Sequence, residues 1–239
     1  MIETVTALLL AHALADFLFQ TDWINANKRH PGVMLLHAAI VLVTAQAAIG
    51  RIDAPELLAL AAIHLVIDCL KTYGNFTSLT AFLADQAAHL ATIAAVAAYA
   101  PGLWASGAWA AYPQALPFMA LAAGLILALQ AGQYAVGLMM KPHGTRVSSK
   151  GLRRGGQQIG LLERGLIFLF ILTNHPIGVG FLVAAKSILR FGTATRDQRT
   201  AEYVIIGTLA SFGWAIAVAL ATQSLLAALP ALEIGAPRP

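Results

Sequence analysis

The first long apolar segment of the chain, residues 2–20, reads IETVTALLLAHALADFLFQ. A helix needs about 20 predominantly apolar residues to cross a bilayer, so this segment predicts a transmembrane helix. Within the apolar run it carries His12 and Asp16. Ionisable side chains inside a membrane are energetically costly and rare, and by default they mark a functional site. The segment therefore predicts both the fold class and the place to look for function.

The same polar pattern, His-x3-Asp-x20-His, occurs twice in the N-terminal part of the chain. The two copies consist of His12, Asp16 and His37, and of His64, Asp68 and His89. Two helices separate the copies, so the repeats run in the same direction and would be related by a pseudo-two-fold axis along the membrane normal. We predict that residues 1–100 form a four-helix core with a parallel duplication as its origin. Similarity outside the polar residues is slight, which leaves coincidence open as the alternative.

Composition indicates an integral membrane protein. The 239 residues are 59% hydrophobic and 11% charged, and the mean hydropathy is +0.73. An ordinary soluble domain has about 25% charged residues. A chain this long and this apolar predicts an all-α polytopic membrane protein that forms a single domain, residues 1–239. The lone cysteine, Cys69, excludes an intramolecular disulfide.

Hydrophobic runs between polar breaks predict about seven or eight transmembrane helices. The expected spans lie near residues 2–20, 33–50, 55–71, 80–100, 114–140, 156–173, 177–189 and 201–229. The C-terminal helices thus occupy residues 114–229. The span at 177–189 is short and follows Asn174-His175-Pro176. It is either a tilted crossing or a re-entrant segment.

Lysines and arginines are concentrated in alternate loops. One set of loops holds Lys28, Arg29, Lys71, the basic segment 141–154 and the segment 190–199, whereas the opposite set holds little besides Arg51 and Arg238. By the positive-inside rule, the first set faces the cytoplasm and the N-terminus lies outside. The net charge of +4 then reflects membrane topology, and we expect no nucleic-acid partner.

Seven ionisable side chains lie at similar depths on the first four predicted helices, at a rise of about 1.5 Å per residue. They are His12, Asp16, His37, His64, Asp68, Asp85 and His89. Six of them form three pairs four residues apart, which places both members of a pair on one helical face. These pairs are His12 with Asp16, His64 with Asp68, and Asp85 with His89. We predict that the seven groups meet in one cavity open to the cytoplasm.

Imidazole and carboxylate ligands without a thiolate favour zinc, manganese, iron or nickel. We expect a divalent metal cofactor, with zinc first and manganese or iron as alternatives. The predicted ligands are His12, Asp16, His37, His64, Asp68 and His89. These donors exceed the needs of one tetrahedral ion, so a dinuclear site and one ion with a separate base both remain open. A proton relay and structural polar packing are the alternatives that use no metal.

The C-terminal half adds four charged side chains. Glu163 and Arg164 are neighbours on the span 156–173 and therefore point to different faces. Lys186 and Arg190 are four residues apart, and two like charges on one helical face repel unless an anion lies between them. We predict that Lys186, Arg190 and Arg164 bind an anionic lipid headgroup, with snorkelling to the interface as the alternative.

Several motifs resemble one family of bacterial membrane proteins. They are His-Ala-Leu-Ala-Asp-Phe-Leu-Phe-Gln at 12–20, Leu36-His37, His64-Leu-Val-Ile-Asp68 and, further on, residues 159–164, 184–191 and 206–212. Through them nearly the whole chain resembles the family grouped as domain of unknown function 3307. This resemblance implies a bacterial cytoplasmic membrane protein and supplies no activity. The first motif also resembles, more loosely, inner-membrane proteins described as metal-dependent hydrolases.

These observations lead to the hypothesis of a membrane-embedded, metal-dependent hydrolase that acts on a lipid or another amphiphile at the cytoplasmic leaflet. In this interpretation Asp85 and Glu163 are carboxylates free to act as general bases, and Lys28 and Lys71 neutralise developing charge or hold an anionic headgroup. The runner-up is a proton or metal-ion transporter or channel that uses the same groups as a relay. A structural or partner-binding membrane subunit is the third hypothesis. The expected partners are membrane lipids and the substrate, and no feature of the sequence specifies an oligomeric state.

Overall fold

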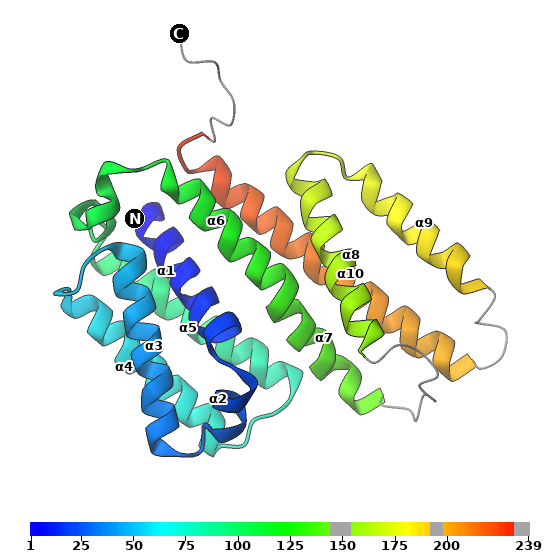
Figure 1. Ribbon diagram of the computed structural model, residues 1–239, viewed down its shortest axis with the longest axis horizontal. Helices are drawn as coiled ribbons and strands as arrows, with labels where there is room; N and C mark the ends of the chain where they lie inside the picture. The colour runs from blue at the N-terminus through cyan, green and yellow to red at the C-terminus, as the bar shows by residue number, and fades with distance from the viewer. Residues whose placement is uncertain (144–153, 192–197, 232–239) are drawn as a thin grey trace, which may run out of the picture. The chain divides into compact units, whose positions relative to one another are not determined.

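The computed structural model describes residues 1–143, 154–191 and 198–231, and every regular element among them is a helix (Figure 1). The elements are α1 (Ile2–Leu14), η1 (Ala15–Phe19), α2 (Asp22–Asn27), α3 (Pro31–Ile49), α4 (Pro55–Tyr73), α5 (Leu79–Tyr99), η2 (Trp104–Ser106), η3 (Ala108–Ala111), α6 (Ala115–Ile126), η4 (Leu127–Ala131), α7 (Gly132–Met140), η5 (Lys141–His143), α8 (Gly155–Leu172), α9 (Ile177–Phe191) and α10 (Gln198–Ala227). Of these, η1 and η4 are single π-helical turns, and η2, η3 and η5 are 3₁₀ turns. The predicted all-α fold is confirmed for this part of the chain.

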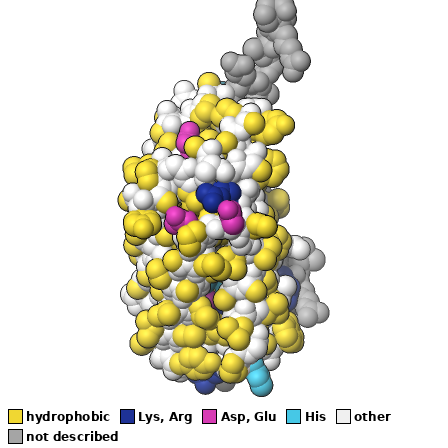
Figure 2. Space-filling view, turned by 90° about the vertical axis from the view of Figure 1, so that its left-hand side faces the viewer, with side chains coloured by type: hydrophobic (Ala, Val, Ile, Leu, Met, Phe, Trp, Pro, Cys, Tyr) yellow, Lys and Arg dark blue, Asp and Glu magenta, His cyan; other side chains and the backbone are white. Residues whose placement is uncertain are grey.

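Five helical segments of the described chain are long and apolar enough to cross a membrane. They are Ile2–Phe19, Pro31–Ile49, Leu79–Tyr99, Ala115–Met140 and Ala201–Ala227. Figure 2 shows a face covered mainly by hydrophobic side chains with few charged groups, a surface suited to contact with lipid. The other three expected spans are less apolar or shorter, since α4 and α8 carry charged residues and the apolar part of α9 covers only Ile177–Ile188. The count of seven or eight crossings stays a prediction.

The chain divides into two compact units. One consists of Met1–Ile126 together with the segment that begins at Ser224, and the other of Leu127–Gln223. The division falls inside the helical stretch Ala115–Met140. The prediction that residues 1–239 act as a single membrane domain stays a prediction.

In the first unit, four helices form a closed ring. Helix α1 packs against α3 and α5, α3 packs against α4, and α4 packs against α5, while α6 covers the outer side of α1 (Figure 1). Small buried residues of α1, Ala7 and Ala11, let the neighbouring backbones approach closely. Leu8, Ile49 and Leu57 are fully buried between them. The ring lies within residues 1–100, and its origin in a duplication stays a prediction.

The helix ends of this unit follow local sequence signals. Pro31 and Pro55 occupy the first turns of α3 and α4, where a proline ring fits and its missing N–H is not needed. Thr21 and Ser78 cap α2 and α5, because their hydroxyl oxygens accept from the N–H groups three residues on. Helix α3 ends at Gly50, whose φ of 75° is the left-handed conformation of a glycine C-cap.

A close approach of two backbone segments fixes the loop between α5 and α6. The N–H of Ala108 donates to the carbonyl of Gly50 at 3.1 Å, and a Cβ added at Gly107 would lie 1.9 Å from the carbonyl oxygen of Ile49. We expect Gly107→Ala to destabilise the protein by about 1–3 kcal/mol, because one of the two backbones must move. Unfolding in detergent measures this, with Gly102→Ala as the matched control, since nothing lies within 4 Å of its added Cβ. Equal stability of the two variants would contradict the expectation.

The second unit is built on α7, α8, α9 and most of α10. Its buried core contains Ile167, Phe168, Phe212 and Ala215. The π turn η4 leaves two backbone carbonyls available to side chains: Leu127 O accepts from the indole of Trp214, and Leu129 O accepts from Arg164. This arrangement satisfies polar groups within an otherwise apolar unit.

Candidate metal centre

The ring of the first unit brings the predicted histidines and aspartates together in its interior. His12 comes from α1, Asp16 from η1 and His37 from α3, while α4 contributes His64 and Asp68. Each of their side chains is at most 8% exposed. The π turn widens the backbone at residues 15–19 and directs Asp16 toward α3 and α4, as π turns do at many functional sites. Sequence spacing predicted the i,i+4 pairs, and nothing in it indicated the π turn.

Four ligand atoms from three parts of the ring converge closely. His37 Nε2 lies 3.5 Å from Asp16 Oδ1 and 3.3 Å from Asp68 Oδ2. His64 Nε2 lies 3.4 Å from Asp16 Oδ1 and 3.5 Å from Asp68 Oδ2. The two Nε2 atoms are 3.3 Å apart. Every separation that involves an imidazole therefore falls between 3.3 and 3.5 Å.

These separations match the edges of a zinc coordination tetrahedron. Zinc bonds to imidazole nitrogen and carboxylate oxygen are about 2.0–2.2 Å long, which places neighbouring ligands about 3.3–3.6 Å apart. Hydrogen bonds are usually shorter, about 2.7–3.2 Å, although the 3.3 Å contact between the two Nε2 atoms also has hydrogen-bond geometry. Five of the six separations among the four atoms of Asp16, His37, His64 and Asp68, all those that involve an imidazole nitrogen, thus match the spacing of ligands around an ion.

Hydrogen bonding within the protein leaves this cluster incompletely satisfied. Asp16 Oδ1 and His37 Nδ1 are buried without a hydrogen-bond partner in the described structure. The facing Nε2 atoms of His37 and His64 can share one proton at most, so the lone pairs of a nitrogen and two carboxylates still point inward. A buried polar atom without a partner costs about 1–3 kcal/mol. A bound cation would satisfy these lone pairs together.

A lysine closes the cluster on the side of α2. Lys28 Nζ donates to Asp68 Oδ2 at 2.8 Å, and both side chains are at least nine-tenths buried. A carboxylate oxygen has two lone pairs, so this bond leaves Asp68 Oδ2 able to contact an ion as well. Lys28 was predicted to hold an anionic headgroup or to neutralise developing charge, and either role stays a prediction. In the structure its ammonium group pairs with Asp68.

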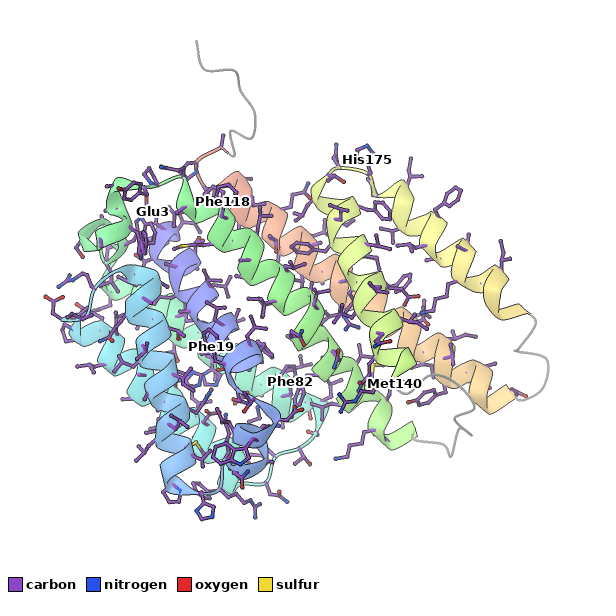
Figure 3. All side chains as sticks on the ribbon, in the orientation of Figure 1. Glu3, Phe19, Phe82, Phe118, Met140 and His175 are labelled. Carbon is purple, nitrogen blue, oxygen red and sulfur yellow. The ribbon has the colours of Figure 1, made fainter. Side chains whose placement is uncertain are left out.

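A second group of polar side chains on α4 and α5 adjoins the first. Asp85 Oδ2 accepts from Lys71 Nζ at 2.6 Å, and Asp85 Oδ1 lies 3.6 Å from His89 Nε2. The His89 ring stacks on that of His64 with centroids 3.9 Å apart. Lys71 also lies 5.6 Å from the ring centre of Phe82, which is labelled in Figure 3. All seven ionisable groups singled out in the sequence therefore belong to one contiguous cluster.

Gln86 is a member of this cluster that sequence reasoning missed. Its amide nitrogen donates to Asp85 Oδ2 at 3.2 Å, so its amide oxygen faces His12, whose Nε2 donates to it at 3.1 Å. The same bond orients the other ring nitrogen, Nδ1, toward Asp16 at 3.8 Å. An uncharged amide inside an apolar helix also indicates a buried polar site, although only ionisable residues were predicted to belong to it.

Overlapping sets of these residues place ligand atoms within 4.8 Å of one another. The sets are His12, Asp16 and His64; His37, His64 and Asp68; and Asp68, Asp85 and His89. Asp68 and His64 each occur in two of them. The predicted ligands are thus assembled, and their binding of a metal stays a prediction.

A small cavity adjoins the cluster on the side away from Lys28 and Lys71. Its water-accessible space is about 10 Å³, room for roughly one water molecule. His12, His64 and His89 form its polar side, and the rest of the lining is Leu8, Ala11, Val41, Ala45, Leu60, Thr92 and Ile93. The sequence predicted a cavity open to the cytoplasm in which the seven groups meet. The cavity found here borders three of them and lies toward the end of the ring away from the lysines.

The C-terminal charged residues form a separate set of contacts within the second unit. Lys186 Nζ donates to Glu163 Oε2 at 2.6 Å and lies 5.3 Å from the ring centre of Phe212. Arg164 donates to Ser211 Oγ at 3.1 Å and to Leu129 O at 3.0 Å. Glu163 thus supplies an anionic partner for Lys186 inside the protein. The side chain of Arg190 and the basic residues Arg146, Lys150 and Arg153 lie outside the described residues.

One known protein family matches the part of the chain that holds the cluster. Residues 4–115 match the model of a family described as protein of unknown function (DUF3307). The segment is similar to this family over slightly less than half of the chain. It contains the whole cluster, from His12 to His89, and the four helices of the ring, α1, α3, α4 and α5. The C-terminal motifs of the family resemblance lie outside the matched segment, and neither the curated proteins nor the solved structures include a match to this chain.

Proposed function

We propose that the segment similar to DUF3307 binds a divalent metal ion inside the membrane, and that the protein is a metal-dependent hydrolase acting on a lipid or another amphiphile at the cytoplasmic leaflet. One observation carries this proposal. Four buried ligand atoms come from Asp16, His37, His64 and Asp68, and their five separations that involve an imidazole nitrogen are those of ligands around one ion. One of these atoms, Asp16 Oδ1, has no hydrogen-bond partner in the described structure. Zinc is the expected ion, and manganese and iron suit the same donors.

The residues around these ligands have the properties that a hydrolytic site needs. A divalent ion in such a site lowers the pKa of bound water and polarises the bond to be cleaved. Asp85 Oδ1 has no hydrogen-bond partner and is available to accept a proton from water. Lys71 is the more exposed of the two lysines, with 26% of its side chain accessible against 9% for Lys28. It is therefore the better placed to meet an anionic headgroup.

Orientation follows from the charge distribution of the loops. Lys28 and Lys71 lie at the end of the ring formed by the loops that follow η1 and α4, and the positive-inside rule places that end at the cytoplasm. The protein would then reside in a bacterial cytoplasmic membrane with its N-terminus outside. In this orientation, the lysine pairs lie between the cluster and the cytoplasmic interface, so we expect substrate to reach the cluster past Lys71.

Metal analysis of the purified full chain tests the proposal. We expect at least one zinc or manganese ion per chain after equilibration with each metal in detergent. Chelation is expected to abolish hydrolysis of lipid esters and phosphate esters in mixed micelles, and added metal is expected to restore it. A wild-type protein that takes up neither metal would remove the basis of the proposal. Proton and metal flux in proteoliposomes would then distinguish a relay from a structural subunit.

A further inference from the structure

Asp85 and His89 provide two possible metal ligands outside the four-ligand centre, which consists of Asp16, His37, His64 and Asp68. Both side chains belong to α5, and they are 5% and 2% exposed. Asp85 Oδ1 and His89 Nε2 are each buried without a hydrogen-bond partner, although they face each other at 3.6 Å. That separation is too long for a hydrogen bond and suits two ligands of one ion.

The remaining contacts of Asp85 hold its free oxygen in place. Its other oxygen, Oδ2, accepts from both Lys71 and Gln86, at 2.6 and 3.2 Å. The carboxylate is therefore oriented by two donors on one side and presents a single unpaired oxygen on the other. Residues that orient ligands in this way are typical of metal sites in proteins.

Asp68 connects this pair of residues with the four-ligand centre. A ligand atom of Asp68 lies within 4.8 Å of those of Asp85 and His89. Asp68 Oδ2 also lies 3.3 and 3.5 Å from the Nε2 atoms of His37 and His64. The stacked rings of His64 and His89, 3.9 Å apart, set the two groups side by side. One carboxylate thus faces both groups, as a bridging ligand does.

We propose that Asp68, Asp85 and His89 hold a second divalent ion, so that the centre is dinuclear with Asp68 as the bridging carboxylate. Asp85 Oδ1 is then a metal ligand and takes this role in place of that of a general base. This inference rests on the proposed function, because Asp68 also belongs to the four-ligand centre. Ions in such pairs lie about 3.5–4 Å apart and act together on one ester group. The three aspartates and two lysines of the cluster nearly balance in charge, so two divalent ions create a positive excess that an anionic substrate would offset.

Counting bound metal tests the second ion directly. The full chain in detergent is equilibrated with manganese alone or zinc alone, and the metal per chain is measured for wild type, His89→Ala and Asp85→Asn. Asp85→Asn keeps the shape of the side chain and guards against a packing defect in His89→Ala. His175→Ala is the matched control, since His175 is exposed at the turn between α8 and α9 (Figure 3). Thermal unfolding confirms that each variant is folded.

We expect two ions per chain in wild type and His175→Ala, and half that content in His89→Ala and Asp85→Asn. With manganese, the electron paramagnetic resonance spectrum should change from that of a coupled pair to that of an isolated ion. One ion in wild type and in folded His89→Ala would overturn the second site while preserving the four-ligand centre. No ion in wild type would overturn both. Any other count in the folded variants overturns the assignment of the second ion to His89 and Asp85.

Discussion

Replacing His37 with alanine is expected to lower the affinity of the protein for zinc by more than about 100-fold and to abolish hydrolysis. His37 is fully buried, and its Nε2 lies within 3.5 Å of one ligand atom each from Asp16, His64 and Asp68. Losing a residue that only orients a ligand costs about 10–100-fold in metal affinity, so losing the ligand itself should cost more. Competition titration with a chromogenic zinc chelator measures the effect.

Two further histidine variants make this prediction specific. His30→Ala is the matched control, since His30 is exposed and its side chain does not cap α3. His12→Ala should have a smaller effect than His37→Ala, because the Nε2 of His12 donates to Gln86 and its Nδ1 lies 3.8 Å from Asp16. Wild-type affinity in His37→Ala, or the same loss in His30→Ala, would refute the assignment of ligands.

The helical periodicity of the sequence was sufficient to predict which side chains meet within each helix. The pairs of His12 with Asp16 and of His64 with Asp68 are in contact because four residues make nearly one helical turn. The apolar runs likewise predicted an all-helical chain. Some helix boundaries differ from the prediction. The second span was expected to begin near residue 33, whereas α3 begins at Pro31, whose fixed φ favours a helix start.

The spacing of residues along the sequence did not predict which side chains of different helices are in contact. The pairing of Lys28 with Asp68, and of Lys71 with Asp85, depends on how α2 and α4 meet their neighbours in the ring. Lys186 was expected to face a lipid headgroup, and its contact with Glu163 depends on how α8 and α9 pack. The π turn at residues 15–19 was likewise not indicated by any residue preference in that segment. Sequence patterns thus predicted the residues of the cluster but not the side chains that pair with them.

Lys28→Met is expected to destabilise the metal-free protein by about 3–5 kcal/mol, the largest stability effect among these variants. The change removes the ammonium group that lies 2.8 Å from Asp68 and leaves a carboxylate that is 3% exposed without its cation. A buried charge that loses its partner is destabilised far more than an exposed one. Lys71→Met should cost less, because its side chain is 26% exposed and water can replace part of the interaction.

The effect of zinc on the destabilisation caused by Lys28→Met distinguishes a metal centre from a purely structural network of ion pairs. Saturating zinc should reduce the destabilisation in Lys28→Met, because an ion held by His37 and His64 also compensates the charge of Asp68. The double variant Lys28→Met, Asp68→Asn should recover much of the metal-free stability, since it no longer buries an unpaired charge. Unfolding curves with and without zinc measure both effects. A loss that zinc leaves unchanged would mean that Lys28 and Asp68 serve only to hold the helices together.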